Sequence, residues 1–181
     1  MQDTKTSLPT LETIFTRRSI RKYTDKEITD EELTLLLKAG MSGPTCVNSR
    51  DWAFLVIRDK NMLQKIANNQ EGQASMLSNA SVAVIVCGDL TRSYKKFPEY
   101  WVVDCSIAGQ NMILAANSMG IGSVWLGTYP ETNRVKGLID LFQLPEHIIP
   151  LAVISFGYPD YSVIKPSVKE PDMSKIHYEK W

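Results

Sequence analysis

The chain has 181 residues, of which 44% are hydrophobic and 22% are charged, with 20 basic and 20 acidic side chains. This composition is typical of a folded protein and excludes an intrinsically disordered chain, and the length suits one domain. The formal net charge of zero argues against a nucleic-acid-binding protein that acts through overall basicity, although it leaves room for one local basic site.

The residue pattern predicts neither export nor membrane insertion. The longest apolar stretch, residues 101–119, contains Asp104 and several amide side chains, so no segment is expected to span a membrane. The first nine residues lack the basic flank and apolar run of a secretory signal. Three cysteines without CxxC spacing and two distant histidines predict a reduced, cytoplasmic protein with no metal site.

The spacing of apolar residues predicts helices alternating with buried strands. The expected helices lie near residue 10 and over 29–40, 59–67, 101–119 and 132–142, and the expected strands over 52–57, 82–87, 122–127 and 148–157. Thr29 and Glu32 form a capping box, with Gly40 as the expected C-cap of the same helix. Residues 42–51 and 90–99 are predicted loops, and the mixture indicates an α+β or α/β fold.

Two segments are expected to need a partner surface. The predicted helix over 101–119 is apolar on most sides, which suits a central helix or a subunit interface. Residues 159–181 have few periodic apolar positions and three aromatic residues near their end. Such a segment cannot fold alone, so it either wraps over another surface or is disordered.

The densest basic cluster is Arg17-Arg18-Ser19-Ile20-Arg21-Lys22. Guanidinium groups bind phosphate in a bidentate manner, and a serine hydroxyl adds a neutral donor. The alternatives are a solvated helix end, where basic residues complement the helix dipole, and a local nucleic-acid contact.

Other patterns are weaker indications of a functional site. Gly120 and Gly122 precede a predicted strand rather than follow one, so they do not form a dinucleotide-binding loop. Cys46 lies in a loop where a nucleophile is conceivable, but two histidines offer few candidate bases. Asp104, on an apolar helix, is expected to be a hydrogen-bonded structural acid rather than a catalytic one.

Five motifs follow one another along the chain. They are RRSIRKY at 17–23, PTCVNSRDW at 44–52, DCSIAGQNMILAANSMGIGSVWLG at 104–127, FGYP at 156–159 and IHYEKW at 176–181. Together they resemble the FMN-dependent nitroreductase family, whose members carry R-R-S-x-R-x-[YF] and P-S-x-x-N-x-Q-P-W motifs. The resemblance covers nearly the whole chain and favours the phosphate interpretation of the basic cluster.

This resemblance implies an α+β nitroreductase-like fold with a central, mainly antiparallel sheet flanked by helices. It implies one FMN-binding domain over 1–181, assembled as an intertwined homodimer with FMN at the interface. Residues 159–181 would be a C-terminal extension that wraps the partner subunit.

The resemblance also implies which residues hold FMN. Arg17 and Ser19 would bind the phosphate, with Arg18 nearby and Lys169 or Lys165 completing the site. Arg21 would lie beside the pyrimidine edge, where positive charge stabilises the reduced flavin. Pro44, Thr45 and Cys46 would come from the other subunit and pack on the ring, and Asn48 would bond ribityl hydroxyls or polar edges of the flavin. Trp125, Leu126 and Gly127 would line the opposite side, with the Leu126 backbone N–H as the candidate donor to the hydride-accepting nitrogen. No side chain is expected to act as a catalytic acid or base.

Two segments depart from the family pattern. Arg50-Asp51 replaces Gln-Pro, and this pair is expected to be a surface ion pair. Residues 88–100 are short for the segment that roofs the substrate, which suggests an open site. Tyr94, Phe97, Tyr100 and Trp101 are candidates for stacking on a flat substrate, with core packing as the alternative for Trp101.

The expected activity is transfer of a hydride from NADH or NADPH, through FMN, to a flat electron-poor acceptor such as a nitroaromatic or quinone, by a ping-pong mechanism. Three alternatives stay open: other flavin chemistry on the same scaffold, such as dehalogenation or enone reduction; a flavin-binding redox module with little turnover; and a nucleic-acid-binding module.

Overall fold

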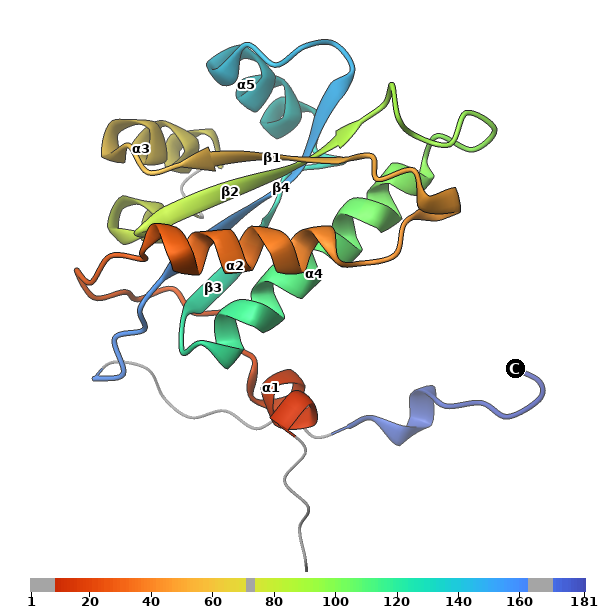
Figure 1. Ribbon diagram of the computed structural model, residues 1–181, viewed down its shortest axis with the longest axis horizontal. Helices are drawn as coiled ribbons and strands as arrows, with labels where there is room; N and C mark the ends of the chain where they lie inside the picture. The colour runs from red at the N-terminus through yellow and green to blue at the C-terminus, as the bar shows by residue number, and fades with distance from the viewer. Residues whose placement is uncertain (1–8, 71–73, 163–170) are drawn as a thin grey trace, which may run out of the picture.

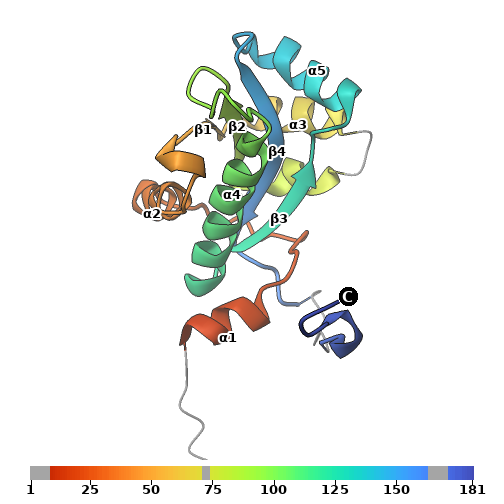
Figure 2. The ribbon, with the colours of Figure 1, turned by 90° about the vertical axis from the view of Figure 1, so that its right-hand side faces the viewer.

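The fold is a four-stranded antiparallel sheet with helices on both faces (Figures 1 and 2). The computed structural model describes residues 9–70, 74–162 and 171–181. The sheet order is β1 (Trp52–Ile57), β2 (Val82–Asp89), β4 (Ile148–Gly157), β3 (Gly122–Gly127), and every neighbouring pair is antiparallel. The expected α+β class is confirmed.

Two apolar cores form because successive strand residues point to opposite faces of the sheet. Val82, Val84 and Val86 of β2 pack toward α2 (Asp30–Met41) and α4 (Tyr100–Ser118). Ala83 and Ile85 pack toward α3 (Lys60–Asn69) and α5 (Thr132–Phe142). Short 3-10 turns occur at Cys46–Asn48, Ser75–Asn79 and Met173–Lys175.

The start of α2 confirms the predicted capping box. Thr29 Oγ1 accepts from the Glu32 N–H at 3.2 Å, and Glu32 accepts in return from the Thr29 N–H at 2.9 Å. The predicted C-cap is wrong, because Gly40 lies inside α2 and the cap is Ser42. A Cβ on Gly40 would lie 3.0 Å from Met112 Cγ, so this glycine serves the close approach of α2 to α4.

Helix α4 is the central helix of its face. Gly109 makes room for the Trp125 ring, since a Cβ there would lie 2.4 Å from Trp125 Cζ3. Trp101 is buried against Gly88 and meets Tyr129 edge-on at 5.0 Å between ring centroids. Trp101 is therefore a core residue. The chain leaves α4 through Gly120, whose φ of +72° is the left-handed conformation that glycine adopts readily.

Both ends of the described chain expose apolar side chains. Helix α1 (Pro9–Thr16) lies beside the C-terminal end of α4, where Asn117 Nδ2 donates to the Thr13 carbonyl at 2.9 Å. The apolar residues of α1, including Phe15 at 76% exposure, are not buried within the chain. Residues 171–181 are exposed as well (Figure 1). Among the described helices, none is long and apolar enough to cross a membrane.

Candidate functional site

The arginine segment, residues 17–21, is anchored beside the start of β3. The Ile20 N–H donates to the Ser123 carbonyl at 2.8 Å, and Ser19 pairs with Ser123 in a parallel bridge. Ile20 is buried over Gly122, where an added Cβ would lie 2.7 Å from Ile20 Cγ2. Because neighbours in an extended segment alternate in direction, burial of Ile20 leaves Ser19 and Arg21 exposed.

This segment offers several donors to an anion. Arg17 and Arg18 are half-buried, and Arg21 is exposed. Within the part of the chain that the structure describes, neither the Arg17 nor the Ser19 side chain forms a hydrogen bond or an ion pair. Three guanidinium groups and a hydroxyl within five residues have the charge and geometry to bind a phosphate.

Strand β3 is an edge strand, and its register shows which peptide groups face outward. The Ser123 carbonyl accepts from Ile20, and the Gly127 carbonyl accepts from Arg134 Nη1 at 3.2 Å, so both residues face away from β4. Peptide groups alternate along an antiparallel strand, which turns those of Leu126 toward Val153 of β4. The register therefore favours Gly127 over Leu126 as a backbone donor to a ligand at this edge.

Gly127 stands apart from the other glycines of the sheet. Gly122 and Gly157 leave room for Ile20 and Tyr23, whereas a Cβ added to Gly127 would meet nothing within 4 Å. Its φ is not positive either, so neither packing nor backbone conformation requires a glycine. The bare backbone lies about 13 Å from Ser123, at ~3.3 Å per residue, and leaves space for a group from outside the chain.

The predicted flavin loop, residues 44–50, connects α2 to β1 in a strained conformation. Val47, Asn48 and Arg50 have φ of 47°, 57° and 51°. Non-glycine residues in this left-handed region cost about 1–3 kcal/mol each, and a β-branched valine is especially unusual there. The Arg50 N–H donates to Thr45 Oγ1 at 3.0 Å, and Arg50 Nε donates to Asn48 Oδ1 at 3.2 Å. The loop thus needs further contacts to keep its shape.

Those contacts come from Asp104 on α4. The Cys46 N–H lies 3.0 and 2.9 Å from the two Asp104 carboxyl oxygens, and Ser49 Oγ donates to Oδ2 at 3.3 Å. Asp104 is thus hydrogen-bonded, as expected. Burial raises its pKa, and the neighbouring Asp51 carboxylate raises it further.

The prediction that Arg50 and Asp51 form a surface ion pair is wrong. Arg50 is exposed and bonds Asn48, whereas Asp51 is fully buried, and its Oδ2 accepts from Ser93 Oγ at 2.8 Å. Burial, together with the Asp104 and Asp51 charges, raises the pKa of the Cys46 thiol. A raised thiol pKa disfavours the thiolate, which argues against Cys46 as a nucleophile.

The arginine segment and the loop of residues 44–50 lie at opposite ends of α4. The loop is tied to Asp104 near its N-terminal end, and α1, which leads into Arg17, is tied to Asn117. Thirteen residues at 1.5 Å separate these positions by about 20 Å along the helix. One copy of the chain therefore does not bring the two halves of the expected site together.

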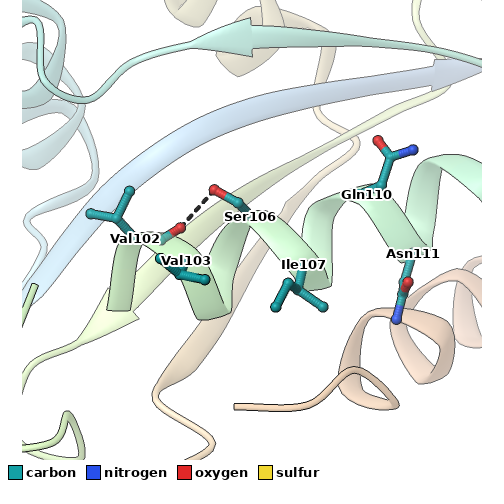
Figure 3. A pocket seen from close by; sticks show the side chains of 6 residues that line it. All are labelled: Val102, Val103, Ser106, Ile107, Gln110 and Asn111. Carbon is teal, nitrogen blue, oxygen red and sulfur yellow. Dashed lines mark hydrogen bonds between the residues drawn. The ribbon is translucent and has the colours of Figure 1, made fainter. Parts of the chain in front are cut away.

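Between these ends, α4 presents an open, mostly apolar surface. Figure 3 shows the six side chains that line a shallow hollow of about 440 Å³: Val102, Val103, Ser106, Ile107, Gln110 and Asn111. Val103 is 50% exposed although it is apolar. This side of α4 therefore has apolar surface that is free to contact another surface.

Three aromatic residues follow β2 near this surface. Tyr94 and Phe97 lie 6.1 Å apart between ring centroids, and Phe97 and Tyr100 lie 6.3 Å apart. Phe97 and Tyr100 are 50% and 45% exposed, so they have surface to offer a flat ligand.

Pattern reasoning missed two members of this region. Ser93 bonds Asp51, which is 42 residues away, and Arg134 bonds the Gly127 carbonyl across the connection between β3 and α5; neither residue belongs to a recognisable motif. Lys165 and Lys169, the candidates to complete the phosphate site, lie outside the described residues.

Comparison with known proteins agrees with this geometry. The model of the nitroreductase family matches residues 14–75 and 60–158. A protein from Methanothermobacter thermautotrophicus, named "Putative NADH dehydrogenase/NAD(P)H nitroreductase", is 48% identical over 94% of this chain and 87% of its own length. The chain therefore belongs to the nitroreductase family, and it is an oxidoreductase of that family, as the motifs predicted.

Solved structures confirm the fold. A protein of the same name from Bacteroides thetaiotaomicron VPI-5482 superposes with a TM-score of 0.85 at 41% identity, covering 97% of this chain and 100% of that chain. An FMN-dependent nitroreductase from Clostridium difficile R20291 superposes with a TM-score of 0.85 at 28% identity, covering 94% and 99% of the two chains.

Proposed function

We propose that this chain is an FMN-dependent oxidoreductase that passes a hydride from NADH or NADPH to a flat, electron-poor acceptor, either a nitroaromatic or a quinone. The observation that carries the proposal is the outer edge of β3, with phosphate-binding side chains at one end and the open backbone of Gly127 at the other. A ligand with a phosphate at one end and a planar ring at the other fits this edge. The related nitroreductase that is FMN-dependent supports the choice of ligand.

Each residue of the edge has a part in holding FMN. Arg17, Arg18 and Ser19 bind the phosphate, and Lys165 or Lys169 is the proposed fourth phosphate donor. Arg21 supplies positive charge near the ring, Trp125 and Leu126 line the edge, and the Gly127 N–H donates to the ring. When bound, FMN supplies the hydride-accepting and hydride-donating chemistry.

The protein's contribution is to position the flavin and its substrates and to exclude water, because the described edge offers no acid–base pair. A flat nicotinamide or acceptor in contact with the ring is held by aromatic surface, for which Phe97 and Tyr100 are available. One open face for both substrates implies that they bind in turn.

The assembly we propose is a homodimer that buries the open face of α4. A two-fold axis across α4 near Gln110, midway between Asp104 and Asn117, would place the loop of one copy, with Pro44, Thr45, Cys46 and Asn48, beside the arginine segment of the other and so bridge the gap of about 20 Å. The exposed apolar residues of α1 and of the C-terminal residues 171–181 would then pack on the partner. The chain is one domain, with 159–181 as the extension that embraces the second copy.

The test is optical and kinetic. The purified protein, supplied with FMN, should show the bound-flavin visible spectrum, and anaerobic NADH or NADPH should bleach it. With menadione or a nitroaromatic as acceptor, double-reciprocal plots should give parallel lines. Intersecting lines would refute binding in turn, bleaching without turnover would favour a redox module, and a colourless protein that does not bind FMN would refute the proposal.

A further inference from the structure

Beneath the loop of residues 44–50 lies a pair of buried acids. Asp51 is fully buried, Asp104 is 3% exposed, and the Asp51 carboxyl lies close enough to raise the pKa of Asp104. In the described part of the chain neither forms an ion pair with a lysine, arginine or histidine. Two carboxylates so close and so dry cannot both be charged without a cation.

The hydrogen-bond inventory indicates where the compensating proton lies. Asp51 Oδ2 accepts from Ser93, but Asp51 Oδ1 is buried with no donor among the described groups. A buried acceptor without a donor is costly, and a proton held by Asp104 would provide that donor. The Asp104 carboxyl oxygens also accept hydrogen bonds from the Cys46 N–H and the Ser49 hydroxyl.

This pair joins the parts of the chain that shape the proposed flavin site. Asp104 holds the strained loop at Cys46, and Asp51 directly precedes β1, the strand that follows the loop. Through Ser93, whose Oγ is also 3.0 Å from the Pro98 carbonyl, Asp51 reaches the segment of exposed aromatic residues. The loop and that segment therefore depend on one buried contact.

We propose that Asp51 and Asp104 share a single proton, and that this pair is a positioning device that holds the loop of residues 44–50 in its ligand-binding shape. The positioning role rests on the proposed function, because the loop would contact FMN bound to the other subunit. The shared proton does not depend on that function.

The other ionisable groups around the pair do not replace this proton at neutral pH. They are the Cys46 thiol from the loop and the Cys105 thiol from α4, with Cys87 of β2 behind Cys105. Burial raises the pKa of all three thiols, to about 12 for Cys87, so these groups stay neutral. Ser49 and Ser93 do not titrate in this range.

The shared proton makes the hold on the loop weaker at high pH. A carboxyl whose pKa is raised in the folded state stabilises the fold fully below its unfolded pKa, about 3.9, and loses that contribution as pH rises through the folded pKa. Loss of the shared proton leaves two facing charges and weakens the hold on the loop. Because one proton is involved, FMN affinity should fall by at most about tenfold per pH unit on the alkaline side.

Asp104→Asn is the informative variant, because its amide donates to Asp51 and still accepts from Cys46 but has no proton to lose. Asp51→Asn is the second variant, should the first not fold, and Asp140→Asn, at an exposed site on α5, is the matched control. NMR of carbon-13 aspartate carboxyls assigns the Asp104 resonance as the one that Asp104→Asn removes. In the parent it should titrate above the ordinary aspartate pKa of about 3.9; titration at or below that value would overturn the shared proton.

The positioning role has its own readouts. Amide exchange protection at Cys46, corrected for intrinsic rates, should fall with rising pH in the parent and in Asp140→Asn but stay constant in Asp104→Asn. FMN affinity should follow the same pattern. Equal pH dependence in the parent and Asp104→Asn would overturn the positioning role. If FMN failed to bind at any pH, the proposed function would fail, and the NMR titration and the amide exchange would still decide this proposal.

Discussion

Arg17 should contribute to the affinity for FMN and hardly at all to the stability of the fold. The structure describes no hydrogen bond or ion pair of its side chain, so Arg17→Ala should change the free energy of unfolding of the apoprotein by less than about 0.5 kcal/mol. A hydrogen bond to a charged group contributes roughly 1.5–3 kcal/mol. Since 1.4 kcal/mol corresponds to a factor of ten, the Kd for FMN should rise by about 10- to 150-fold.

The assay is a titration of apoprotein with FMN, followed by the quenching of flavin fluorescence and paired with thermal unfolding in the absence of FMN. Arg17→Lys keeps the charge but loses the planar fork, so its loss of affinity should be intermediate. Lys65→Ala, on the exposed side of α3, controls for the loss of one positive charge. An unchanged Kd in Arg17→Ala would refute the phosphate site, and an equal loss in Lys65→Ala would show a nonspecific charge effect.

Three further substitutions test the ligand site, the subunit interface and the core one by one. Gly127→Val should weaken FMN binding by about 1–3 kcal/mol, read by the same titration, with little change in apoprotein melting; normal affinity would remove Gly127 from the site. Val103→Asp should shift the assembly toward monomer in analytical ultracentrifugation, and an intact dimer would contradict the α4 interface. Trp101→Ala should lower the free energy of unfolding by about 3–5 kcal/mol in urea titration, whereas a loss below 1 kcal/mol would refute its place in the core.

The features that were predicted correctly are those with local causes. The α2 capping box joins residues three apart, and apolar spacing within single segments predicted the strands 122–127 and 148–157 to the residue. Such signals are complete within a short window, so the sequence alone suffices for them.

The features that were missed depend on contacts distant along the chain. Gly40 resembles a C-cap until α4 is seen packed against it. Asp51 resembles half of a surface ion pair because its partners, Ser93 and Asp104, are 42 and 53 residues away. The choice between Leu126 and Gly127 as backbone donor requires the register of β3 against β4, which no single-strand pattern contains. The motif resemblance predicts which residues form the proposed site, and the register of β3 is the observation that favours Gly127.

The central claim is that FMN is bound at sites built from two copies of this chain. Native mass spectrometry of the FMN-loaded protein tests it directly, because mass reports subunit and ligand numbers together. The account predicts two chains with two FMN molecules, and Val103→Asp should lose dimer and FMN together. A single chain that retains FMN would contradict it.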